Sequence, residues 1–113
     1  MNVQIFGTKK SFDSKKAERY FKERGIKYQF VDMKEKGLSK GEFNSVCQAV
    51  GGYEKLTDPK CKDKNLLALV QYLSEEDKKE KILENQKIIR TPIVRNGKQA
   101  TVGYEPDVWK DWK

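Results

Sequence analysis

Residues 3–25 read VQIFGTKKSFDSKKAERYFKERG, and most of the predicted fold follows from this stretch. Its apolar start, formed by Val3, Ile5 and Phe6, has the length of a short buried strand. Gly7 breaks that run, and the polar residues after it cannot continue a buried strand. The stretch therefore begins with a strand that ends in a polar loop.

A helix follows the loop. Ser11 or Asp13 can cap its N-terminus, and Gly25 can end it in a left-handed conformation. Three apolar residues at i, i+3 and i+4 spacing form its inner face: Ala17, Tyr20 and Phe21. A strand that leads into a helix N-terminus presents free backbone N–H groups and the positive end of the helix dipole. Both favour an anion or an ionised nucleophile.

Residues 26–31 alternate in polarity and are rich in β-forming types, which predicts a second strand. Strand, helix and strand within about thirty residues form a βαβ unit, so the two strands should be parallel, with a right-handed crossover. Ser39 and Glu42 then form a capping-box pattern, which opens a helix that runs to about Val50.

The middle of the chain, about residues 39–85, is predicted to be a helical insertion. Residues 65–73 carry an apolar arc wide enough for a well-buried helix. Ser74 starts another short helix, with acidic residues in its first turn and with Ile82 and Leu83 facing inward. The insertion separates the first half of the sheet from the second.

Residues 88–102 hold the second pair of strands. Asn96 and Gly97 lie between two apolar runs and predict a hairpin with a type I′ turn, whose two central residues both need positive φ. Pro106 fits the first turn of a final helix, and the spacing of Trp109 and Trp112 places both on one side of it.

This order of elements predicts an α/β, thioredoxin-like fold, with residues 1–113 as a single domain. Its mixed four-stranded sheet consists of a β-α-β unit, the helical insertion, a β-hairpin and a C-terminal helix. In that architecture the loop after the first strand meets the segment before the third strand, here Arg90, Thr91 and Pro92. A proline at a strand entrance beside such a loop is a candidate for a cis peptide bond.

Charge and composition exclude several classes of protein. The 24 basic and 17 acidic residues give a net charge of +7, but most lysines are interleaved with acids. This pattern favours solvated helix faces over a nucleic-acid surface. The chain has no membrane-length apolar run and no signal core, so we expect a soluble, cytoplasmic protein without a membrane partner.

The two cysteines are expected in different settings. With no histidine in the chain, they do not form one of the usual zinc sites. Cys47 lies on a helical face with apolar neighbours, which predicts a packed core thiol. Cys61 follows Pro59 and Lys60 in a loop, where an inert surface thiol is favoured over a reactive one.

Three segments resemble the arsenate reductase-like family (ArsC/Spx/YffB type): IFGTKK with KKAERYF at the start, DPKCKDK in the middle, and RTPIVRNGKQATVGY near the end. The resemblance covers nearly the whole chain. It implies a thioredoxin-like fold and, in enzymatic members, reduction of arsenate coupled to glutathione or another thiol donor. The Spx branch implies instead a redox-sensitive regulator that binds RNA polymerase.

The resemblance also implies a cysteine in the first loop, followed three positions later by cysteine, serine or threonine. The matching positions hold Ser11 and Ser14. A cysteine at a helix N-terminus is stabilised as a thiolate, whereas a serine hydroxyl stays protonated without a base, and no histidine is present to act as one. Three interpretations stay open: an engineered replacement of the thiol, a natural loss of catalysis, or a helix cap that never had chemistry.

The other predicted site residues surround Ser11. Lys9 and Lys10 taken singly are expected to be solvated loop lysines, but as a pair with Ser11 they would hold an anion. Three residues at the start of the helix would help: Phe12, Asp13 and Ser14. Thr91 and Pro92 would form the opposite wall.

Arginines are the residues that would clamp an oxyanion in this setting. The resemblance implies one directly before the proline, but this chain has Arg90 one position earlier. Lys60 stands where many relatives have another arginine. Arg95 is expected to be exposed at the hairpin.

We therefore predict an arsenate reductase-type scaffold with Ser11 at the position of the nucleophile and little or no reductase activity. No cofactor is expected to be bound. The expected substrate is an oxyanion or a thiol, the donor is glutathione or a thioredoxin-type thiol, and a monomer is favoured. The alternative is a non-enzymatic, Spx-like regulatory or protein-binding module.

Overall fold

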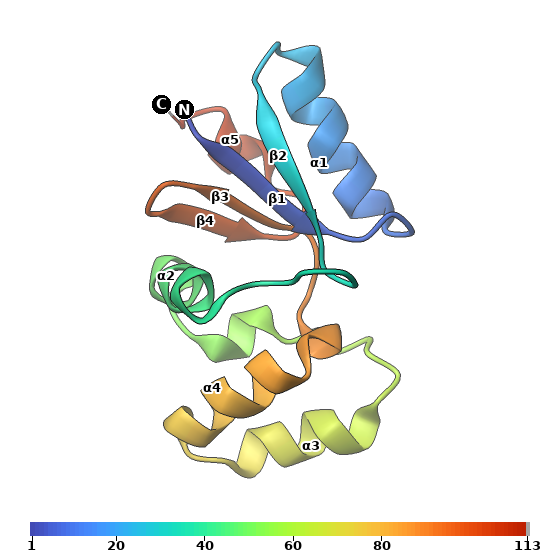
Figure 1. Cartoon of the computed structure of the whole chain (residues 1–113), viewed down its shortest axis with the longest axis vertical. Coiled ribbons are helices and arrows are strands. Elements are labelled where there is room, and N and C mark those ends of the chain that lie inside the picture. Colours follow the sequence, from blue (N-terminus) through green and yellow to red (C-terminus); the bar gives the residue numbers. More distant parts are fainter. Residues whose placement is uncertain (113) are drawn as a thin grey trace.

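The computed structural model describes residues 1–112, and its central element is strand β1 (Val3–Gly7). β1 pairs in parallel with β2 (Tyr28–Asp32) on one side and antiparallel with β3 (Ile93–Asn96) on the other. β4 (Gln99–Val102) pairs antiparallel with β3, which gives the strand order β2-β1-β3-β4 (Figure 1). The predicted mixed four-stranded sheet is confirmed.

Helices cover both faces of this sheet, and β1 contributes to both cores because its side chains alternate. Val3 and Ile5 pack in a cluster with α1 (Phe12–Glu23) and α5 (Pro106–Trp109), whereas Phe6 packs on the opposite face. The second cluster contains residues of α2 (Lys40–Val50), which lies beside β4 (Figure 1).

The predicted N-caps are present. Ser11 caps α1, and Ser39 and Glu42 form the reciprocal capping box of α2. Trp109 and Trp112 are both buried in one cluster, but α5 ends at Trp109, so Trp112 lies beyond the helix that was predicted to carry both. The Trp109 indole N–H donates to the Thr101 hydroxyl at 2.7 Å, which fixes α5 on the last strand.

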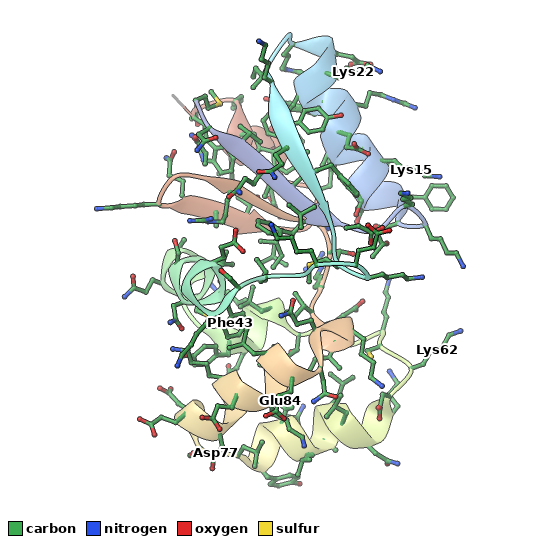
Figure 2. The ribbon with its side chains drawn as sticks, in the orientation of Figure 1. Lys15, Lys22, Phe43, Lys62, Asp77 and Glu84 are labelled. Carbon is green, nitrogen blue, oxygen red and sulfur yellow. The ribbon has the colours of Figure 1, made fainter. Side chains whose placement is uncertain are left out.

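The second half of the helical segment forms a separate layer below the sheet (Figure 1). It contains α3 (Lys64–Tyr72) and α4 (Glu75–Glu84), with short 3₁₀ turns η1 (Tyr53–Leu56) and η2 (Gln86–Ile88) at its two junctions. Phe43 of α2 is fully buried toward this layer and stacks on Tyr53 with ring centroids 5.7 Å apart (Figure 2). No helix among residues 1–112 has the length and hydropathy needed to cross a membrane.

The prediction that residues 65–73 form a well-buried helix is wrong in its burial. Val70 is the only fully buried residue of α3, and Leu69 and Tyr72 are 45% and 87% exposed. α3 packs mainly against α4 at the edge of the molecule, so part of its apolar arc faces solvent.

The β3–β4 turn also differs from the prediction. Asn96 pairs with Gln99, so the two turn residues are Gly97 and Lys98 rather than Asn96 and Gly97. Gly97 has φ = +62°, whereas Lys98 has no positive φ. Glycine at the first central position is the pattern of a type II′ turn, not of the type I′ turn that the Asn-Gly pair suggested.

Two sets of hydrogen bonds tie the helical layer to the segments that flank the sheet: one is made by the Gln86 side chain, the other by backbone groups. The Gln86 side chain accepts from the Leu38 N–H at 2.7 Å and donates to the Leu38 carbonyl at 2.8 Å. The Arg90 N–H donates to the Leu56 carbonyl, and the Asp58 N–H to the Ile88 carbonyl, both at 2.7 Å. These contacts fix the chain directly before it enters β3.

Replacing Gln86 with alanine should destabilise the fold. The Gln86→Ala variant leaves both backbone groups of buried Leu38 without their partner, which should lower the free energy of unfolding by about 1–3 kcal/mol. Urea unfolding measures the loss. Gln71→Ala, at an exposed position of α3, is the matched control and should change little. Equal midpoints for the two variants would contradict the anchoring role of Gln86.

Candidate functional site

The pairing of β1 with β3 determines where the first loop begins. Phe6 lies opposite Ile93, so the carboxyl end of β1 lies beside Pro92. The Thr91–Pro92 peptide bond is cis, as predicted, and Pro92 is buried. The Gly103 N–H donates to the Pro92 carbonyl at 2.8 Å, so the residue after β4 lies beside Pro92. Pro92 and Gly103 thus belong to one wall of the candidate site.

Ser11 lies at the N-terminus of α1 in extended backbone conformation and is half-buried. Its hydroxyl oxygen accepts from the Ser14 N–H at 3.2 Å, and its own N–H donates to the Thr8 carbonyl at 3.2 Å. Of the two residues that the sequence offered as caps, Ser11 is the one that caps α1.

Ser14 stabilises the loop from inside. Its side chain is fully buried, and its hydroxyl oxygen accepts from the Thr8 N–H at 3.3 Å. A Cβ at Gly7 would collide with that hydroxyl, so the end of β1 has room for no side chain. The hydroxyl and the amide of Ser14 are therefore both used within the loop. The amides of Phe12 and Asp13 form no hydrogen bond with residues 1–112.

The other predicted residues divide into two groups. Lys10 and Phe12 are exposed, and Asp13 is half-buried in the first turn. Arg90 is also exposed, but its guanidinium lies against Gly103, where a Cβ would stand 3.1 Å from Nη2. Arg90 and half-buried Thr91 therefore belong to the wall that contains Pro92.

Lys60 lies in the loop that follows the backbone pairing of Thr57 with Ile89, and its N–H donates to Asp58 Oδ1 at 2.9 Å. No hydrogen bond or ion pair within the described range joins Lys60 to residues 8–14.

The expectation that Arg95 is exposed is wrong. Its side chain is largely buried, donates to Gln4 Oε1 at 2.9 Å and lies 3.8 Å from the Glu42 carboxylate. The alternation of β3 places Arg95 on the face that packs toward α2, so it links three elements rather than facing the loop.

Gly103 and Tyr104 are wall residues that the sequence analysis did not assign to the site. Lys16 Nζ lies 5.6 Å from the Tyr104 ring, which joins the segment after β4 to α1. The predicted hairpin could have indicated Gly103 as a site residue, because pairing Ile93 with Val102 places the next residue, Gly103, beside Pro92.

Neither cysteine takes part in these contacts. Cys47 is buried, as predicted, and burial raises the pKa of its thiol from 9.0 to about 12, although Lys79 lowers it slightly. Cys61 is half-buried in its loop, with Sγ 3.9 Å from the Lys87 carbonyl. Residues 1–112 contain no group of three or more side chains that could hold a metal ion.

A family model described as the ArsC family matches residues 6–112. Among solved structures, a protein described as related to the ArsC family from Bacteroides fragilis is 19% identical, with a TM-score of 0.87 over 100% of this chain and 98% of that one. An arsenate reductase from Vibrio cholerae is 25% identical, with a TM-score of 0.82 over 96% and 94%. No curated protein matches the sequence significantly.

A more distant likeness shows the wider fold. The glutaredoxin-like NrdH-redoxin from Escherichia coli is 11% identical, with a TM-score of 0.51 over 100% of this chain and 96% of that one. The likeness is one of fold alone, and it agrees with the thioredoxin-like architecture that the order of elements predicts.

Removing the Ser14 hydroxyl should loosen the first loop. Ser14→Ala deprives the Thr8 N–H of its acceptor in a buried setting, which should cost about 1–3 kcal/mol of unfolding free energy. Amide hydrogen exchange at Thr8 should accelerate in the variant. Ser45→Ala, at a half-buried position of α2, is the control and should leave the exchange rate of Thr8 unchanged. Unchanged exchange at Thr8 in both variants would contradict the role given to Ser14.

Cys47 should make stability depend on alkaline pH. In the unfolded chain this thiol ionises near pH 9.0, whereas the folded chain keeps the proton until about pH 12. The unfolded state therefore binds fewer protons in that window, and the free energy of unfolding falls as the pH rises. The difference in stability between the parent chain and Cys47→Ala should shrink between pH 9 and about pH 10.5. A constant difference across that range would show that the thiol does not titrate as described.

Proposed function

The chain belongs to the ArsC family, and from that premise we propose that it is a thiol-oxidoreductase scaffold in which Ser11 stands at the position of the nucleophilic cysteine. One observation supports the proposal above the others. Ser11 caps α1 four residues after Gly7, the last residue of β1, and the pairing of β1 with β3 puts that strand end next to cis-Pro92.

The chemistry of a hydroxyl explains why we expect little or no arsenate reduction. A cysteine thiolate can attack arsenic and afterwards form a disulfide, whereas a serine has neither capacity. Activation of serine needs a general base, and the chain contains no histidine. The Ser11 hydroxyl oxygen is also occupied as the acceptor for the Ser14 N–H.

Anion binding does not depend on the thiol. We propose that the free amides of Phe12 and Asp13, together with Lys10, bind an oxyanion or the thiolate of a substrate. Arg90 supplies a further positive charge from the wall that contains Thr91 and Pro92. A working version of this site would draw its electrons from glutathione or from a thioredoxin-type protein, with no bound cofactor.

Restoring the thiol tests the proposal. In a Cys61→Ser background, the Ser11→Cys thiol should have a pKa between about 3.5 and 7.5, because the helix N-terminus, the free amides and nearby lysines stabilise the thiolate. The measurement is the rate of thiol alkylation as a function of pH, and reductase assays with arsenate and glutathione should show gained turnover.

The matched control is Ser39→Cys, which places a thiol at the N-cap of another helix, α2. This thiol should have a higher pKa than the one at position 11 and give no turnover. Equal pKa values at the two caps, or reductase turnover by the parent chain with Ser11, would overturn the proposed function.

A further inference from the structure

Positive charge is concentrated in the first part of the chain. Residues 1–36 contain ten Lys and Arg and five Asp and Glu, so they carry five of the seven net positive charges. Most of these cations lie on α1 and the loop before it. Lys15 and Lys22 extend from α1 into solvent on the side away from the helical layer (Figure 2).

One face of α1 borders a groove. Residues one turn apart on a helix share a face, and Phe12, Lys16 and Tyr20 have that spacing. Between this face and the segment after β4 lies a groove of about 370 Å³, lined by Lys16, Arg19, Tyr20, Glu23, Arg24, Tyr104 and Pro106.

Aromatic rings hold two of the three cations of the groove in place. The Arg24 guanidinium lies 3.7 Å from the centroid of the Tyr20 ring and donates to the Tyr20 carbonyl at 3.1 Å. Lys16 lies over Tyr104. Within residues 1–112, neither these two cations nor Arg19 has a carboxylate within 4.0 Å. The groove thus presents three cations and one acid, Glu23.

Phe12 provides an apolar contact at the start of this face. Its side chain is 80% exposed, directly after Ser11 and one turn before Lys16. Nothing in the fold of residues 1–112 uses the ring for packing. An exposed aromatic side chain beside ordered cations is a common arrangement at protein interfaces.

We propose that Phe12 and the groove of Lys16, Arg19, Arg24 and Tyr104 dock an acidic segment of a protein thiol partner. The inference rests on the proposed function, because the docked segment would bring its thiol to position 11. The face from Phe12 to Arg24 spans about 18 Å, which accommodates an extended segment of five or six residues. Complementary charge selects an acidic segment, and the ring of Phe12 selects one with an apolar residue near its thiol.

Binding is tested first on the parent chain with Ser11, so the result does not depend on chemistry at that position. The probe is a labelled peptide of about eight residues, mostly glutamate with one leucine and one cysteine, and its twin carries glutamine in place of glutamate. Fluorescence anisotropy should show about tenfold tighter binding of the acidic peptide, weakening as salt rises.

Charge reversal then locates the surface. The double variant Lys16→Glu with Arg19→Glu should weaken binding at least about tenfold. The matched control, Lys34→Glu with Lys36→Glu, changes the net charge equally in the loop after β2 and should have under about twofold effect. Equal losses of affinity in both double variants would show that the attraction depends only on net charge, and would overturn the proposal. A single-stranded oligonucleotide of equal charge that binds as tightly would overturn it in favour of nucleic acid.

A kinetic test connects the surface to position 11. Ser11→Cys in the Cys61→Ser background is first converted to a mixed disulfide with thionitrobenzoate. The peptide thiolate attacks the sulfur of residue 11, thionitrobenzoate leaves with the electron pair of the broken bond, and a peptide–protein disulfide forms. The acidic peptide should react about tenfold faster than its glutamine twin, and Phe12→Ala should slow both peptides, because both carry the leucine that the ring contacts.

Tyr72→Ala, which removes another exposed aromatic side chain, should leave both rates unchanged. No effect of Phe12→Ala would overturn the role of the ring. A docked peptide that gives no rate advantage would show binding away from position 11 and would also overturn the proposal. A Ser11→Cys thiol with an ordinary pKa, by contrast, would contradict only the proposed function, because binding to the parent chain is measured separately.

Discussion

The pairing of β1 on both of its edges is the constraint on which the rest of the structure depends. β2 and β3 occupy its two hydrogen-bonding edges, and α1 with α5 on one side and α2 on the other enclose its two faces. The chain that leaves β1 after Gly7 can therefore continue only at the end of the strand, beside the entrance to β3. The first loop, which leads to the Ser11 cap of α1, thus begins next to cis-Pro92.

The helical layer contributes to the site indirectly, by fixing the chain before β3. Residues 56–58 pair with residues 88–90, and Gln86 holds the loop at Leu38 from the other side. Both contacts lie within a few residues of Pro92. The helical layer therefore supports the segment before Pro92, although most of its residues lie below the sheet, away from α1 (Figure 1).

Local patterns predicted the elements well, because capping boxes, glycine stops and side-chain alternation act over a few residues. Ser39 with Glu42 is of this kind. The βαβ unit spans about thirty residues, and the cis bond at Pro92 was expected from the order of the elements. Arg95 could not be placed in this way, because the residues that hold it, Gln4 and Glu42, are each more than fifty residues away in sequence. The type of the hairpin turn depends on which residues of β3 and β4 pair last. The observed pair, Asn96 with Gln99, places the turn one residue later than the Asn-Gly pair suggested.

A cysteine at position 11 would combine two properties, capping of α1 and nucleophilic chemistry, whereas a serine supplies only the first. As an N-cap, serine is among the best residues available, and here its oxygen holds the Ser14 N–H while Ser14 in turn holds Thr8. If Ser11 stands at the position of the nucleophilic cysteine, as we propose, the geometry of the loop is kept without that nucleophile. The cations on the face of α1 are positioned by Tyr20 and Tyr104, not by residue 11. The proposed recognition of a charged partner would therefore need nothing from a thiol at position 11.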